Sequence, residues 1–156
     1  MTSQVQDHSK KHGSIVAVCV SPKKGMIKTE VESGIIEEGF GIRDDAHGGD
    51  WHRQVSLLAI EEIEKMNQKG FDVKPGSFAE NLCTRDFDLS SAAIGKKIMI
   101  GDQIVLEVTQ IGKECHTRCA VYNKIGDCIM PEQGVFTKVI SGGVVKPGDS
   151  ISFLSD

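Results

Sequence analysis

The feature of this sequence that most constrains its fold is a series of short strand patterns, separated by glycine-rich turns, with one helical pattern among them. Apolar and β-branched residues dominate the segments Ser14–Val20, Gln54–Leu58, Lys97–Ile100, Gln103–Thr109, Val135–Ser141 and Ser150–Phe153. Such residues favour β-strands, and glycine favours the tight turns between them. Glycine supplies 17 of the 156 residues, whereas aromatic residues supply only 5%. The pattern predicts a mainly β domain, built as a small barrel or a sandwich.

The helical pattern covers Ala59–Lys69. Ile60, Ile63 and Met66 recur there at near-helical spacing, so they share one face of the helix. Gly70 follows at the place where a helix end favours the left-handed conformation. We therefore predict one main helix over this stretch, packed against the sheet.

Turn signals indicate how other strands are joined. Lys97–Ile100 and Gln103–Thr109 flank Gly101-Asp102, which is typical of a β-hairpin. Gly142-Gly143 is expected to be a further turn, directly after the strand over Val135–Ser141.

The length of the chain predicts a single domain with an ordinary hydrophobic core. Residues 1–13 are polar and are expected to form a flexible tail, in which His8 and His12 are solvated rather than ligands. The domain then covers residues 14–156. The tail lacks the apolar core of a signal peptide, and no apolar run reaches the length of a membrane span. We therefore expect a cytoplasmic protein that has no membrane partner.

Charge and motifs argue against several classes of function. Lys and Arg number 18 against 22 Asp and Glu, a formal net charge of −4. A mildly acidic chain lacks the basic surface of a nucleic-acid-binding protein, so no such partner is expected. The glycine-rich loops of nucleotide-binding folds and the nucleophile elbow of α/β hydrolases are also missing from the sequence.

The chain has five cysteines, and in a reducing compartment they are not expected to form disulfides. Cys19 and Cys83 lie in apolar surroundings and are interpreted as small core residues. Cys115 differs because Lys113 and two further basic side chains, His116 and Arg118, flank it. Cationic neighbours favour the thiolate, which is the nucleophilic and metal-binding form. Cys115 is therefore a candidate reactive or metal-ligating residue, the alternative being an ordinary loop cysteine.

A zinc site is a weaker interpretation of the same segment. Cys115, Cys119 and Cys128 offer only one short ligand pair, whereas structural zinc sites usually use two. The adjacent residues Cys115 and His116 rarely converge on one ion. The roles of Cys119 and Cys128 stay open, with partly buried small residues as the preferred interpretation.

Gly39–Arg53 has a high density of glycine, charge and histidine, so it is predicted to be a loop. Its polar side chains could bind a divalent metal, namely those of His47, His52, Asp44, Asp45 and Asp50. Alternatively, its backbone N–H groups and Arg53 could contact an anionic ligand. A solvated loop whose glycines serve turns is the plainer alternative.

Several motifs, in the same order along the chain, resemble those of the MOSC domain, named after the C-terminal domain of molybdenum-cofactor sulfurases. The motifs are Asp45–Gly49, Arg53–Leu58, Pro75–Leu82, Ile94-Gly95, Ile100–Asp102, Leu106–Gln110 and Cys115. The resemblance covers nearly the whole chain, from Ser14 to Phe153. The resemblance implies a β-barrel of the pyruvate-kinase-barrel type, with one main helix and short peripheral helices.

The resemblance also implies a site. Cys115 matches the family's central cysteine, which either ligates molybdenum in the bound pterin cofactor or carries sulfur as a persulfide. By position, contacts to the molybdenum cofactor (Mo-molybdopterin) are expected from His47, Arg53, Ser56, Asn81 and Lys113. A soft thiolate suits molybdenum, and cationic neighbours suit the anionic pterin phosphate.

The implied role is cofactor maturation or sulfur transfer, with a sulfur donor or a molybdoenzyme as partner protein. Pyridoxal phosphate is expected only on a partner desulfurase, because this chain is too short to include that domain. One alternative is a small molybdenum-dependent reductase of N-hydroxylated compounds, which needs a separate electron donor. Another is a thiol redox or zinc-binding regulatory domain that uses Cys115, Cys119 and Cys128.

Overall fold

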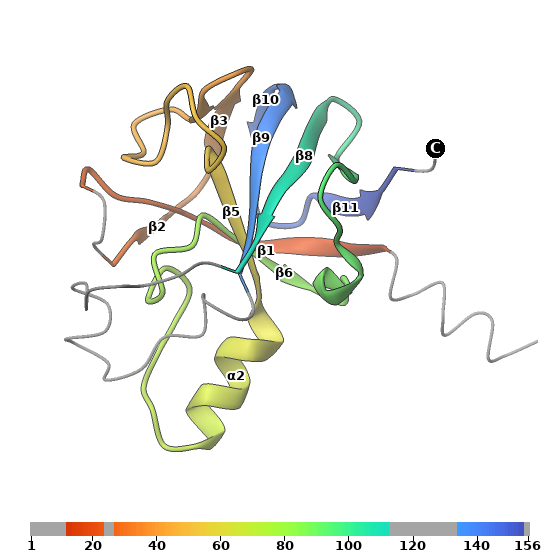
Figure 1. The fold of residues 1–156 in the computed structure, drawn as a ribbon. Coiled ribbons are helices and arrows are strands. Elements are labelled where there is room, and N and C mark those ends of the chain that lie inside the picture. Colours follow the sequence, from red (N-terminus) through yellow and green to blue (C-terminus); the bar gives the residue numbers. More distant parts are fainter. Residues whose placement is uncertain (1–11, 24–26, 113–133, 155–156) are drawn as a thin grey trace, which may run out of the picture.

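The computed structural model describes residues 12–23, 27–112 and 134–154. Within these ranges the chain is mainly β, with one α-helix and one short 3-10 helix (Figure 1). The strands are β1 (His12–Val20), β2 (Thr29–Val31), β3 (Gly34–Glu37), β4 (Gly41–Ile42), β5 (Val55–Ala59), β6 (Leu82–Arg85), β7 (Lys97–Ile100), β8 (Ile104–Ile111), β9 (Val135–Ser141), β10 (Gly143–Val145) and β11 (Ser150–Phe153). The helices are α2 (Ile60–Gln68) and η1 (Leu89–Ser91).

Seven strands close into a barrel in the order β11-β7-β8-β9-β5-β6-β1, because β1 also pairs with β11. β2 extends the sheet beyond β1. β5 and β6 are parallel and α2 connects them, whereas the other described strand pairs of the barrel are antiparallel. A smaller sheet, β10-β3-β4, lies beside the barrel. The structure therefore selects the barrel over the sandwich.

Two apolar clusters hold these layers together. One fills the barrel with Ile, Val and Leu side chains from its strands. The second lies between the outer surface of the barrel and α2, and it contains Cys19 and Cys83 beside Ile63, Met66 and Phe78. Both thiols are fully buried and free, so the interpretation of these two cysteines as core residues is confirmed.

The helix forms where its pattern predicts it. Ile60, Ile63 and Met66 are its buried residues, and Lys69 caps its C-terminus. Gly70 then takes a φ of 102°, which an L side chain rarely adopts. No helix in the described ranges is both long and apolar enough to cross a bilayer.

Two boundaries differ from the prediction. β1 begins at His12, two residues before the expected strand, and its Gly13 is packed so closely that a Cβ there would lie 2.3 Å from the Arg85 carbonyl oxygen. Gly143 is not a turn residue: it begins β10 and pairs with Ile36 of β3. The extra pairing belongs to the small sheet, which local turn chemistry did not reveal.

Candidate functional site

The loop between β4 and β5 is tied to the barrel by its own backbone. Ala46 N donates to Ser21 O at 2.8 Å, and Gly49 N donates to Phe40 O at 2.8 Å. Asp44 turns the chain with a φ of 70°. The predicted loop is therefore present, and it is fixed at the end of β1 and at the turn between β3 and β4.

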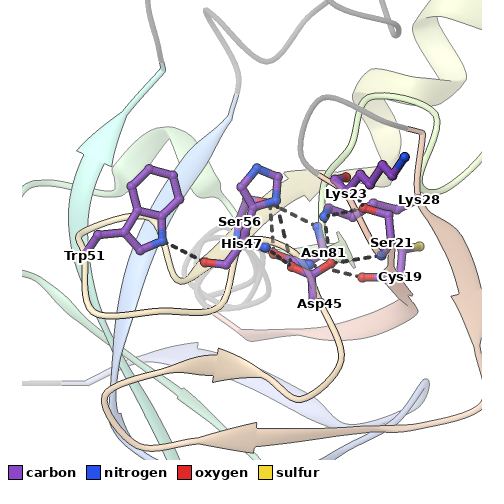
Figure 2. A network of polar contacts seen from close by, with 9 residues as sticks. All are labelled: Cys19, Ser21, Lys23, Lys28, Asp45, His47, Trp51, Ser56 and Asn81. Atoms are coloured by element: carbon purple, nitrogen blue, oxygen red, sulfur yellow. Dashed lines mark hydrogen bonds and ion pairs between the residues drawn. The ribbon is translucent and has the colours of Figure 1, made fainter.

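A buried ion pair anchors this loop. Lys28 Nζ lies 2.7 Å from Asp45 Oδ1, and both side chains are fully buried. Ser21 joins the pair, since its N–H donates to Asp45 Oδ1 at 3.0 Å and its Oγ accepts from Lys28 Nζ at 3.2 Å (Figure 2). The pairing connects the start of β2, the end of β1 and the loop.

Burial and pairing act in opposite directions on the pKa of each partner, and a different one prevails in each. Burial by itself raises the pKa of Asp45, but the hydrogen bond and charge of Lys28, helped by Asn81 and Ser21, outweigh it and leave the pKa below its usual value. Burial lowers the pKa of Lys28 by more than Asp45 raises it. The carboxylate form of Asp45 thus depends on Lys28.

Asp45 also fixes His47. The backbone N–H of His47 donates to Asp45 Oδ2 at 3.1 Å, and His47 Nδ1 lies 3.8 Å from the same oxygen. Trp51 Nε1 donates to the His47 carbonyl oxygen at 2.7 Å. The two rings are nearly parallel, 3° apart, with centroids 6.1 Å apart. His47 and Trp51 therefore form one ordered aromatic pair on the loop.

Ser56 and Asn81 lie inside this network. Asn81 Oδ1 accepts from Ser56 N at 2.9 Å and from Ser56 Oγ at 3.2 Å, and Asn81 Nδ2 donates to Cys19 O at 3.1 Å. Both side chains are buried. They join β1, β5 and the start of β6, and their polar atoms are bonded to protein groups.

Glu80, whose role the sequence did not predict, is part of the buried framework behind the site. It is fully buried, and its carboxylate accepts from Gly76 N at 2.7 Å and Phe78 N at 3.1 Å. The Cys83 thiol donates to it at 2.9 Å. Burial raises the pKa of Glu80 and of the Cys83 thiol. A lone acidic residue in an apolar stretch after a Pro-Gly turn was the available signal.

Arg53 also lies close to Trp51. Its guanidinium carbon is 5.8 Å from the centroid of the Trp51 ring and 5.3 Å from that of Phe136. Arg53 Nε donates to Gln110 Oε1 at 3.0 Å. Among the described residues neither Nη group of Arg53 has a hydrogen-bond partner, so the end of the fork is available for an anion.

The structure thus brings together four of the six residues predicted for the site. His47 and Arg53 each lie close to the Trp51 ring, and Ser56 and Asn81 are buried beneath the loop's anchor. Lys113 and Cys115 lie outside the described residues, as do the other sequence candidates His8, His116, Arg118, Cys119 and Cys128. In the described part of the chain no three His, Cys, Asp or Glu side chains are arranged to hold a metal ion. The described part of the site consists of the Arg53 guanidinium and the rings of His47 and Trp51.

Comparisons with known proteins agree with this fold. The family model described as MOSC domain matches residues 43–152. No curated protein matches the sequence. Among solved structures, the YuaD protein from Bacillus subtilis is 19% identical with a TM-score of 0.76, the match covering 93% of this chain and 97% of that one. YiiM from Geobacillus stearothermophilus is 19% identical with a TM-score of 0.68, covering 92% and 75% of the two chains. YiiM from Escherichia coli is 18% identical with a TM-score of 0.65, covering 92% and 70%.

At these identities the solved structures show a shared fold. The family match spans most of the chain and includes the loop and barrel strands described above. The chain therefore belongs to the MOSC domain family.

Proposed function

We propose that this protein binds the molybdenum cofactor (Mo-molybdopterin) and acts in its maturation or in sulfur transfer through Cys115. The family is associated with molybdenum-cofactor binding and sulfurase-like function. The observation that carries the proposal is the Arg53 guanidinium, held at Nε by Gln110 beside the parallel rings of His47 and Trp51. This arrangement suits a ligand that combines an anionic group with a flat ring.

The residues present fit the two ends of such a cofactor. An arginine fork pairs with a phosphate group through two parallel hydrogen bonds, which a lysine cannot do. The half-buried rings of His47 and Trp51 offer faces for a pterin, and Lys113 adds a second cation. We propose direct contacts from His47, Arg53 and Lys113, while Ser56 and Asn81 hold the loop that presents them.

The short chain distance between Gly112 and Cys115 supports the assignment of Cys115 to this site. It follows Gly112 by three residues, and three residues span about 11 Å at most. Gln110 Nε2 donates to the Gly112 carbonyl oxygen at 2.7 Å, and Gln110 also bonds Arg53. A Cys115 thiolate is a suitable soft ligand for molybdenum, and the bound cofactor would supply its redox and sulfur-accepting chemistry.

Sulfur transfer would use the same thiolate. Cys115 would attack the terminal sulfur of a persulfide on a partner desulfurase, forming the Cys115 persulfide and releasing the donor's thiolate. Pyridoxal phosphate would belong to that partner. The acceptor would be the bound cofactor or a molybdoenzyme that receives it.

The test is the composition of protein purified from cells that make the cofactor. We expect molybdenum and pterin near one per chain in wild type, retained in Cys119→Ala and lost in Cys115→Ala. Intact mass separates the two roles, because an added sulfur atom that disappears in Cys115→Ala identifies a carrier.

Absence of molybdenum, pterin and added sulfur from wild type would overturn the proposal. Zinc that survives Cys115→Ala but is lost in Cys119→Ala would replace it with a zinc-binding domain. Reduction of an amidoxime by the loaded protein and an added electron donor would instead identify the reductase.

A further inference from the structure

A β-bulge alters the direction of one side chain beside Arg53. In the antiparallel pairing of β8 with β9, Val108 lies opposite Thr137 and Gln110 lies opposite Phe136, so two steps along β8 match one step along β9. Thr109 is therefore an extra residue in β8, and its Oγ1 donates to the carbonyl oxygens of His52 and Phe136. Bulges next to functional sites commonly re-aim a side chain. Here the re-aimed residue is Gln110.

Gln110 uses both ends of its amide. Its Oε1 accepts from Arg53 Nε at 3.0 Å and contacts His52 Nε2 at 2.9 Å. Its Nε2 donates to the Gly112 carbonyl oxygen at 2.7 Å. A single amide thus joins two consecutive residues of the loop to the end of β8.

These contacts determine the orientation of the Gln110 amide and the tautomer of His52. A carbonyl oxygen such as that of Gly112 can only accept, so the NH2 group of the Gln110 amide must face it. Oε1 then faces Arg53 and His52, and the close contact with His52 requires a proton on Nε2. Neutral His52 is therefore the Nε2–H tautomer. The guanidinium is held at Nε by Gln110 and lies near the rings of Trp51 and Phe136, and among the described residues its Nη groups have no hydrogen-bond partner.

We propose that Gln110 is a positioning residue that ties Arg53 to His52 and so holds the Arg53 guanidinium as an anion clamp, whose ligand is a phosphate monoester. The inference rests on the proposed function, because it names the part of the cofactor that this clamp binds. Gln110 acts through Arg53 and does not itself contact the ligand. A glutamate in its place would still accept from Arg53 Nε but would neutralise the charge that attracts the anion.

The experiment uses the full-length protein and inorganic phosphate as the probe. Arg53→Lys identifies the Arg53 Nε–H signal in a nitrogen-15 NMR spectrum, and phosphate affinity is measured by titration at fixed ionic strength. In Gln110→Met we expect the Arg53 Nε–H signal to move to the position of solvated arginines and the His52 tautomer preference to be lost. We also expect the affinity for phosphate to fall about tenfold, which is roughly the value of one charge-assisted hydrogen bond.

Gln110→Glu separates positioning from charge. We expect it to keep a hydrogen-bonded Arg53 Nε–H signal and still to bind phosphate more weakly than wild type. Gln68→Met, at an exposed residue of α2, is the matched control and should leave all three measurements unchanged. Circular dichroism spectra establish that each variant is folded.

An Arg53 signal that does not change in Gln110→Met would overturn the inference, as would a wild-type protein that does not bind phosphate. None of these measurements requires molybdenum. A protein purified without the cofactor would therefore contradict the proposed function but leave the role of Gln110 supported by the NMR and phosphate data.

Discussion

Replacing Lys28 with methionine tests how much the loop that carries His47 depends on the buried ion pair. Methionine keeps most of the apolar stem of lysine, so packing changes little. The substitution leaves the buried Asp45 carboxylate without its cation, while the N–H groups of Ser21 and His47 still donate to it. Removing one partner of a buried ion pair generally costs about 3–5 kcal/mol.

The pKa of Asp45 sets a limit on this cost. The uncompensated carboxylate can take up a proton, and for a group whose ordinary pKa is 3.8 this costs about 4 kcal/mol at pH 7 but only about 1 kcal/mol at pH 4.5. In wild type Asp45 has a lowered pKa and stays charged over this range, so it adds no slope. In Lys28→Met its folded pKa is raised, so stability is lost as the pH rises. We expect losses of about 3–4 kcal/mol at pH 7 and about 1 kcal/mol at pH 4.5.

Urea unfolding at the two pH values measures these losses. Far-UV circular dichroism follows the barrel, and the fluorescence of Trp51, the single tryptophan of the chain, follows the loop. Lys23→Met, at an exposed lysine in the same connection, is the control and should change stability by less than about 0.5 kcal/mol.

The double variant Lys28→Met, Asp45→Asn removes both charges. It should recover most of the loss at pH 7, because an uncharged pair needs no compensation. The reasoning is refuted if Lys28→Met loses less than about 1 kcal/mol at pH 7, or if its loss is the same at both pH values.

Three further substitutions have effects that urea unfolding at pH 7 can measure. Gly76→Ala should destabilise the protein by more than about 3 kcal/mol, because φ is 91° and the new Cβ would lie 2.1 Å from the Lys28 carbonyl oxygen. Gly70→Ala is its control, since φ is similar but the space is open, and it should cost clearly less stability. Asn81→Ala should cost about 2–5 kcal/mol, since it leaves Ser56 N–H and the Cys19 carbonyl unpaired in the core; equal stability would contradict its role as a link. Ile63→Ala should cost about 2–5 kcal/mol through the cavity it leaves under α2, and a loss below about 1 kcal/mol would mean that the helix contributes little to the core.

The sequence predicted the barrel strands and the helix because their signals are local. Ile60, Ile63 and Met66 fall on one helical face, and Gly101-Asp102 lies between two strand patterns. Register pairing of Ile100 with Ile104 confirms that hairpin. The closure of the sheet into a barrel depends on pairing between distant strands, which local patterns do not show. Only the family resemblance predicted a barrel rather than a sandwich.

The site was harder to predict because its contacts join distant parts of the chain. Lys28 and Asp45 are separated by 17 positions and meet only after β1, β2 and the loop are assembled. Arg53 and Gln110 are separated by 57 positions, and a bulge decides where Gln110 points. His47 and Arg53 were predicted as site residues from the motifs, but those motifs gave no sign that Ser56 and Asn81 bond each other.

The pairing of β1 with β11 has a consequence for how the chain is made. His12 lies opposite Ser152 and Ser14 opposite Ser150, so the last seam of the barrel joins the two ends of the described chain. Contacts of such sequence separation slow folding, because a long loop must close before they form. On the ribosome the first strand cannot find this neighbour until translation has passed Phe153 and the segment has left the exit tunnel. During synthesis β1 therefore exposes an unpaired edge, and chaperones that shield strand edges should act on the nascent chain until β11 emerges.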